Sequence, residues 1–178
     1  MRQPVTVIDV PASSLLAPSL ASADFFDAYR VGLADAGQSA LEIYLDMVSR
    51  TPAWVTCLMT LRNRVVALLG LKDLGNLGDV DAGKPASAYR VGDRVGIFSL
   101  LALSEREVVL GDADKHLEVK LSVCKLDPPE PAAGGQASVA VSTVVHNRNA
   151  LGRVYMLFVA PLHRRIVPAT MGAIGAGA

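Results

Sequence analysis

The sequence contains two segments in which apolar and polar residues alternate with a period of two, and they constrain the fold more than any other feature. Residues 116–123 read HLEVKLSV and residues 137–146 read ASVAVSTVVH. Successive side chains of a β-strand point to opposite faces, so each segment is predicted to be a strand with one buried face. The expected inward residues are Leu117, Val119, Leu121, Val123, Val139, Val141, Thr143 and Val145. The expected outward residues of the first segment are His116, Glu118, Lys120 and Ser122.

Three other segments are also predicted to be strands: residues 25–31, 94–104 and 107–111. The half-buried face of the first consists of Phe25, Tyr29 and Val31, with Asp27 between them. The second is apolar on both sides, which is typical of an interior strand, and a tight polar turn separates it from the third. Short turns join antiparallel neighbours, whereas parallel strands need long crossovers, so we expect an antiparallel meander.

Two helices are expected between the first strand and the meander. Residues 39–50 have an amphipathic pattern, with Asp46 and Arg50 paired four residues apart on the outside. Thr51 and Pro52 then favour the start of a second helix over residues 53–70. The apolar stripe of this second helix consists of Trp54, Leu58, Leu61, Val65 and Leu68. Of the two interpretations of Trp54, core residue or ligand platform, the core is favoured.

A third, long helix follows the strands. Asn149 can cap its start, and an interior proline, Pro161, is expected to bend it so that it follows a curved sheet. The predicted apolar side consists of Leu151, Val154, Tyr155, Phe158, Leu162 and Ile166. A sheet that must be covered by a few helices is typical of an α+β fold. We therefore expect a curved antiparallel sheet wrapped around the C-terminal helix, with a pocket between them.

The domain organisation is expected to be simple. Residues 1–170 are interpreted as a single domain, and residues 171–178 as a disordered Gly/Ala-rich tail. Residues 75–87 and 127–136 are rich in Pro and Gly and are expected to be loops.

Composition and charge exclude several classes of protein. The chain has 17 basic and 17 acidic residues, so no broad field attracts nucleic acid or an anionic membrane. The longest apolar run near the C-terminus, residues 154–162, is too short to span a bilayer, and the first residues do not resemble a signal peptide. Cys57 and Cys124 form neither a CxxC pair nor a disulfide framework, which favours reduced thiols in a cytoplasmic protein. A homodimer is left open.

Three stretches are similar to a known family. They are YRVGDRVGIF (89–98), EVVLGDADKHLEVKLSV (107–123) and STVVHNRNALGRVYMLFVAPLHRRIV (142–167). They resemble DUF2867, a bacterial family of unknown function thought to be related to the START/SRPBCC helix-grip superfamily. The resemblance implies a helix-grip fold with a hydrophobic cavity under the C-terminal helix, and it implies no known reaction.

Residues suited to catalysis are few. His116 is a candidate general base, oriented by Glu118 or Asp114, and His116, Asp114 and His146 form a candidate metal-ligand set. Their spacing fixes neither arrangement and favours a turn aspartate beside a surface histidine. The sequence has no phosphate-binding GxxxxGK[ST], no GxGxxG and no GxSxG, so no cofactor, metal ligand or catalytic residue is assigned.

The junction between the last strand and the last helix carries His146, Asn149, Arg153 and Tyr155. One interpretation is a capping network that fixes the start of the helix, with Gly152 allowing close approach to another backbone. The other is that Arg153 or Tyr155 binds a carboxylate or hydroxyl group of a ligand in an apolar pocket.

These observations favour a binding protein for a small apolar or amphipathic molecule, lipid-like or polyketide-like. The predicted ligand-binding residues are Tyr29, Trp54, Leu58, Arg153, Tyr155 and Phe158. Two alternatives remain. One is a cyclase or dehydratase that uses His116, Tyr29 or Tyr155 as acid or base, and the other is an interaction module with a vestigial cavity.

Overall fold

A computed structural model describes residues 4–68, 80–81, 83–127, 136–172 and 174, with only the backbone described for residues 65–68. The strands are β1 (Thr6–Val7), β2 (Phe25–Gly32), β3 (Arg94–Val95), β4 (Phe98–Leu103), β5 (Glu107–Ala113), β6 (Leu117–Leu126) and β7 (Ser138–Asn147). The helices are α1 (Ala40–Ser49), α2 (Ala53–Leu68) and α3 (Ala150–Met171), with short 3-10 helices η1 (Ala17–Ser22) and η2 (Ala86–Ala88).

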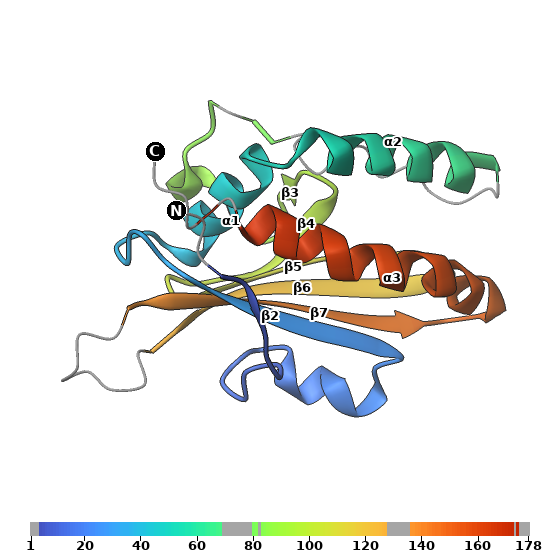
Figure 1. Ribbon diagram of the computed structural model, residues 1–178, viewed down its shortest axis with the longest axis horizontal. Coiled ribbons are helices and arrows are strands. Elements are labelled where there is room, and N and C mark those ends of the chain that lie inside the picture. Colours follow the sequence, from blue (N-terminus) through green and yellow to red (C-terminus); the bar gives the residue numbers. More distant parts are fainter. Residues whose placement is uncertain (1–3, 69–79, 82, 128–135, 173, 175–178) are drawn as a thin grey trace.

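The seven strands form one antiparallel sheet in the order β1-β2-β7-β6-β5-β4-β3. Strands β3 to β7 follow one another as a meander, which confirms the prediction. Strand β2 comes from far earlier in the chain and pairs with β7, so that Asp27 lies directly opposite Thr143. With the 22-residue helix α3 laid along one face, the curved sheet confirms an α+β, helix-grip-like fold (Figure 1).

Residues 94–104 form two strands, β3 and β4, and not the single interior strand that was predicted. The chain turns sharply at Gly96, whose φ of 60° lies in the left-handed region that glycine adopts without strain. Val95 therefore pairs with Phe98, and the segment forms a hairpin at the edge of the sheet. Leu101 and Leu103 are exposed, as expected of a strand near an edge.

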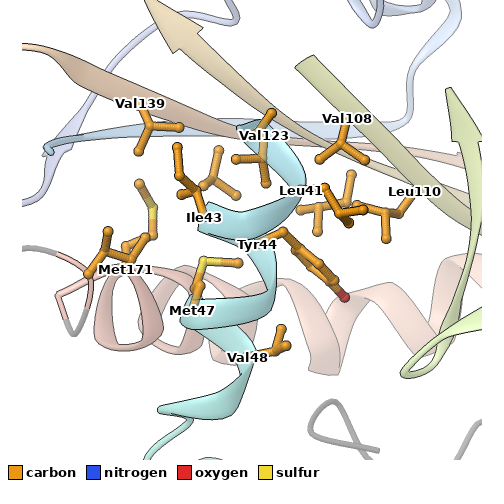
Figure 2. Packing of buried hydrophobic residues seen from close by; sticks show 14 of the residues in the cluster. Leu41, Ile43, Tyr44, Met47, Val48, Val108, Leu110, Val123, Val139 and Met171 are labelled. Atoms are coloured by element: carbon orange, nitrogen blue, oxygen red, sulfur yellow. The ribbon is translucent and has the colours of Figure 1, made fainter. Parts of the chain in front are cut away.

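Helix α1 packs its apolar side onto the inner face of the sheet (Figure 2). Ser39 and Glu42 form a capping box, in which each side chain bonds the backbone N–H of the other residue, and this fixes where the helix starts. Asp46 and Arg50 form the predicted ion pair at 2.8 Å. The buried side of α1 consists of Ala40, Leu41, Ile43, Tyr44, Met47 and Val48.

The outer face of the sheet is covered by the N-terminal segment, residues 8–24 (Figure 1). Val10 and Leu16 pack there against Ala28 and Val144. Because this segment covers the sheet, Ser122 is fully buried rather than exposed to solvent, as the alternation had predicted. Both faces of the central strands are therefore buried.

Helix α2 begins at Ala53, as predicted, but its packing differs from the prediction, and its predicted end at residue 70 lies outside the described residues. Trp54 and Leu61 are 46% and 57% exposed, so the favoured placement of Trp54 in the core is wrong. Val55 is buried instead, with Leu58 half-buried beside it. The side chains of Val65 and Leu68 lie outside the described residues. Helix α2 thus contacts the rest of the protein along a narrow line.

Helix α3 is capped by Asn149, as predicted, and its predicted apolar side is confirmed for Leu151, Tyr155, Leu162 and Ile166, which line the pocket described below. A Cβ atom at Gly152 would overlap the backbone oxygen of His116, so glycine allows the close approach that its position suggested. This contact turns Gly152 and Met156 to the sheet and leaves Val154 and Phe158 exposed. The prediction that Val154 and Phe158 face inward is therefore wrong.

The C-terminal end of α3 packs into the main core. The helix runs through Pro161 and Pro168 to Met171, which is fully buried, and Ile174 is also buried. The rest of the predicted tail, residues 173 and 175–178, lies outside the described residues. So do residues 75–79, 82 and 128–135 of the predicted loops. None of the described helices is long and apolar enough to cross a membrane.

Candidate functional pocket

A pocket of about 220 Å³ lies between the inner face of the sheet and the three helices. Strands β6 and β7 form its floor, and α3 lies along one side. Leu58 and Met59 of α2 line it together with Tyr44 and Met47 of α1. Most of the lining is aliphatic or aromatic, so the few polar groups at its surface are expected to orient whatever it holds.

The best-organised polar group in the pocket is His163 of α3. Its Nδ1 lies 3.0 Å from Oδ2 of Asp27, and its Nε2 lies 3.3 Å from Oγ1 of Thr143. Since Asp27 and Thr143 are directly opposed on β2 and β7, one imidazole ring bridges the two strands. The edge of the Phe25 ring packs against the imidazole, with centroids 5.8 Å apart. The ring is therefore held on three sides.

These contacts define the hydrogen-bonding state of His163. A carboxylate can only accept, so Nδ1 carries the proton that it donates to Asp27. In the neutral ring, Nε2 then has a free lone pair, which accepts the hydroxyl proton of Thr143. Both His163 and Thr143 line the pocket. The basic nitrogen of the neutral ring is therefore Nε2, next to a hydroxyl of the pocket lining.

Asp27 is itself held beneath the pocket. Its side chain is 9% exposed, and Oδ2 also accepts a hydrogen bond from the hydroxyl of Tyr29 at 3.3 Å. Burial, together with the Asp27 carboxylate, raises the pKa of Tyr29 to about 12, so this hydroxyl stays protonated and acts as the donor. The other oxygen, Oδ1, is buried and has no hydrogen-bond partner among the described residues.

Tyr44 contributes a second notable group. Its ring is fully buried and lines the pocket, and its hydroxyl has no partner in the described part of the chain. Figure 2 shows this hydroxyl directed away from the aliphatic side chains around α1. Burial raises the pKa of Tyr44, so the group is a neutral donor. A buried donor without a partner is costly, and a ligand acceptor would satisfy it.

One end of the pocket is built from the start of α3. The amide of Asn149 contacts Nδ1 of His116 and donates to the backbone oxygen of Lys115, while its carbonyl caps Gly152. Asp114 accepts from the backbone N–H groups of His116 and Leu117. Although burial opposes the effect, these amides hold the pKa of Asp114 below its usual value. This end is a capping network, and His116 is buried beneath it rather than exposed as predicted.

A further contact joins α2 to α3 beside the pocket. Nε of Arg62 donates to the hydroxyl of Tyr155 at 2.9 Å, and the guanidinium lies 5.6 Å from the centre of the Tyr155 ring. Both residues line the pocket. Few of the described side chains of α2 are buried, so this pair helps to hold α2 over the pocket.

The model of the family described as "Protein of unknown function (DUF2867)" matches residues 19–170. The chain belongs to the DUF2867 family. All the residues that line the pocket fall within the matched region. No curated protein and no solved structure matches this DUF2867 chain.

The pocket of this DUF2867 protein contains two of the six predicted ligand-binding residues, Leu58 and Tyr155. Tyr29 is buried and does not line the pocket. Its hydroxyl bonds Asp27, which in turn contacts a residue of the lining. Trp54, Arg153 and Phe158 are exposed and lie outside its lining.

The predicted cluster at the strand–helix junction does not form. His146 points to the outer face, where its Nε2 contacts the backbone oxygen of Ser19 and the hydroxyl of Ser22. Asn149 caps α3, and Arg153 is exposed. Because His146 lies on the other side of the sheet, it cannot join His116 and Asp114 in one site. The described residues include no group of three or more His, Cys, Asp or Glu side chains placed to hold a metal ion.

The periodicity of the sequence does not identify His163, Asp27 and Thr143 as one functional group. A partial signal was present, because Asp27 shares the inward face of β2 with Phe25 and Tyr29, and a buried carboxylate needs a partner. His163 does not belong to the apolar side that periodicity predicts for this helix. The orientation of α3 that turns His163 inward depends on the contact of Gly152 with His116, which periodicity does not reveal.

Proposed function

We propose that this DUF2867 protein binds a compact apolar or amphipathic small molecule in the pocket under α3. The observation that carries the proposal is the pocket itself, about 220 Å³ with a mostly apolar lining. This volume is below the roughly 300–1,000 Å³ typical of sites for drug-sized ligands, which favours a compact molecule over a long-chain lipid.

The polar groups in the pocket indicate which ligand chemistry it suits. Tyr44 offers a neutral hydroxyl donor, and Thr143 and His163 offer a hydroxyl and an imidazole. Such groups recognise carbonyl or hydroxyl oxygens. Arg153, the cation expected to bind a carboxylate, is exposed outside the pocket, and Arg62, which lines it, bonds Tyr155 and Asn63, so the proposed contacts use no acidic ligand group.

The test is a titration of the ¹⁵N-labelled protein with 1-indanone, 2-naphthol and decanoate, followed by two-dimensional NMR. We expect saturable shifts from 1-indanone and 2-naphthol in residues around the pocket, and weaker binding of decanoate. Trp54 is exposed outside the pocket, so its emission would report this binding poorly.

A matched pair of variants on α2 locates the binding. Leu58 lines the pocket, whereas Leu61 on the same helix is exposed. Leu58→Trp should fill the pocket and weaken binding by about 10-fold, equivalent to about 1.4 kcal/mol, while Leu61→Trp should leave it unchanged. Equal effects of the two variants, or no saturable binding of any probe, would contradict the proposal.

A further inference from the structure

His163 has the surroundings of a general base rather than of a simple packing residue. Asp27 fixes Nδ1 as the donor, Thr143 and Phe25 hold the plane of the ring, and Nε2 lies next to Thr143, which lines the pocket as His163 does. An imidazole that is oriented by a carboxylate and faces an apolar pocket is suited to proton transfer near neutral pH. No other histidine in the chain has this arrangement, because Nδ1 of His116, which also lines the pocket, contacts the amide of Asn149 instead of a carboxylate, and His146 lies on the outer face.

The contact between Nε2 and Thr143 does not prevent this role. At 3.3 Å it is longer than a typical hydroxyl hydrogen bond of about 2.8 Å, and a hydroxyl can rotate to another acceptor. A ligand proton can therefore replace the Thr143 proton at Nε2. Asp27 has no place in the pocket lining, so its part is to position the ring.

The same geometry disfavours Thr143 as a nucleophile for acyl transfer. Strand β7 is hydrogen-bonded to β2 on one side and to β6 on the other. Its backbone N–H groups are consumed by the sheet and cannot form an oxyanion hole beside Thr143. Among the described residues that line the pocket, Tyr44 has a buried hydroxyl without a partner, and this donor suits a developing negative charge on a ligand oxygen.

We infer that His163, positioned by Asp27, is a catalytic acid and base that transfers a proton next to a carbonyl group of the bound ligand, with Tyr44 donating to the carbonyl oxygen. In the first step the C–H bond next to the carbonyl breaks and its proton moves to Nε2. The electron pair of that bond forms a C=C bond, and the carbonyl π pair moves to the oxygen as an enolate. The imidazolium then delivers a proton, either the same one or one that it has exchanged with water, to the same carbon or to a conjugated one. This exchange or isomerisation consumes no other reactant.

The inference rests on the proposed function, and its test uses 1-indanone as the probe. The intact protein is incubated with 1-indanone in D₂O, and the loss of the C2 proton signal is followed by NMR. We expect a saturable exchange rate above that of free imidazole at the same concentration. His163→Gln should lower the rate by about 100-fold, and His146→Gln, the matched substitution on the outer face, should leave it unchanged.

Other variants separate the three roles. Tyr44→Phe should lower the exchange rate on the order of 100-fold, as loss of an oxyanion donor does. Thr143→Val should lower it by about fivefold at most, the effect of one neutral hydrogen bond. Asp27→Asn should lower it by at least about 10-fold, because the ring is then free to adopt the other tautomer. Long-range ¹H–¹⁵N spectra should show His163 protonated at Nδ1 in the wild type and a mixed tautomer in Asp27→Asn, which a purely structural role of Asp27 in packing would not produce.

Several outcomes would overturn the inference. Saturable binding of 1-indanone without accelerated exchange would do so, as would exchange that survives His163→Gln in the folded protein. If Thr143→Val lowered the exchange rate as much as His163→Gln, the Thr143 hydroxyl and not the imidazole would be the group that transfers the proton. Failure of 1-indanone to bind also rejects the inference, and if 2-naphthol and decanoate fail as well, the proposed function fails with it.

Discussion

The two faces of the sheet each bury a carboxylate, and the two carboxylates have very different surroundings. On the outer face, Oε1 of Glu107 accepts from the hydroxyls of Ser14 and Ser122, both at 2.6 Å. The backbone N–H of Leu15 lies 3.0 Å from both Glu107 oxygens. On the inner face, Asp27 bonds through one oxygen only and leaves Oδ1 without a partner in the described residues.

The difference shows that burial of a carboxylate does not by itself indicate a functional site. All the donors around Glu107 are neutral groups of the N-terminal segment and β6, so it serves as a clamp between that segment and the sheet. Asp27 instead bonds a titratable ring that faces the pocket. The nature of the partner, and whether that partner reaches the pocket, distinguish the two roles.

The largest expected effect is loss of the outer clamp. Glu107→Ala leaves Ser14, Ser122 and the N–H of Leu15 buried without their shared acceptor and should lower the free energy of unfolding by about 4 kcal/mol. Urea denaturation measures this change. Ser14→Ala removes only one donor and should cost about 1 kcal/mol. A cost below about 1 kcal/mol for Glu107→Ala would show that Glu107 is not a clamp.

The next prediction concerns the orientation of α3, which places His163 on the inner face. Met156 is buried and Phe158 is 72% exposed. Met156→Ala should therefore cost about 3 kcal/mol, and Phe158→Ala less than about 0.5 kcal/mol. Thermal or urea unfolding of both variants gives the comparison. A larger cost for Phe158→Ala would support the orientation predicted by periodicity and remove His163 from the pocket.

Burial on the outer face of the sheet should also protect the thiol of Cys124 from alkylation. Cys124 pairs with Glu107 across β5 and β6, and burial, aided by this carboxylate, raises the pKa of Cys124 to about 11. At pH 8 its thiolate fraction is therefore about 100-fold lower than that of an ordinary cysteine. Iodoacetamide followed by peptide mass spectrometry should modify the exposed Cys57 first. In Glu107→Ala the modification of Cys124 should become faster, and an unchanged rate would argue against the clamp.

Removal of the inner carboxylate should affect stability much less than removal of the outer one. Asp27→Asn keeps the shape and one acceptor oxygen, so it should lower the free energy of unfolding by only about 1 kcal/mol. The same substitution should strongly reduce proton exchange of 1-indanone. Urea denaturation and the exchange assay on the same preparation test both parts. A loss of stability as large as that of Glu107→Ala would make Asp27 a structural clamp as well.

Local signals in the sequence predicted most of the elements. The alternation around residues 117–126 and 138–147 identified β6 and β7 because one face of each meets the core. Ser39 and Pro52 lie at the predicted starts of α1 and α2. Such starts can be predicted because helix initiation depends on neighbouring residues only. The order of the elements then led to the correct fold class.

The errors arose where distant contacts decided the outcome. The N-terminal segment has no periodic pattern, so its burial of Ser122 could not be anticipated. Trp54 is exposed because the described part of α2 meets the core through other side chains, among them Val55 and Met59. In the candidate site, Leu58 and Tyr155 were predicted, whereas His163 required knowledge of how Gly152 sets the rotation of α3. Apolar residues surround α3 on more than one side, so its stripe was ambiguous.

The pairing of β2 with β7 has a consequence for how the chain folds. Asp27 and Thr143 are neighbours in the sheet although more than 100 residues separate them in sequence. Such non-local pairings carry a large loop-closure cost and slow folding. During synthesis, β2 must wait until β7 has emerged from the ribosome, while β3 to β7 can pair in order. We therefore expect the meander to form early and the Asp27–His163–Thr143 arrangement to be completed in the last stage of folding.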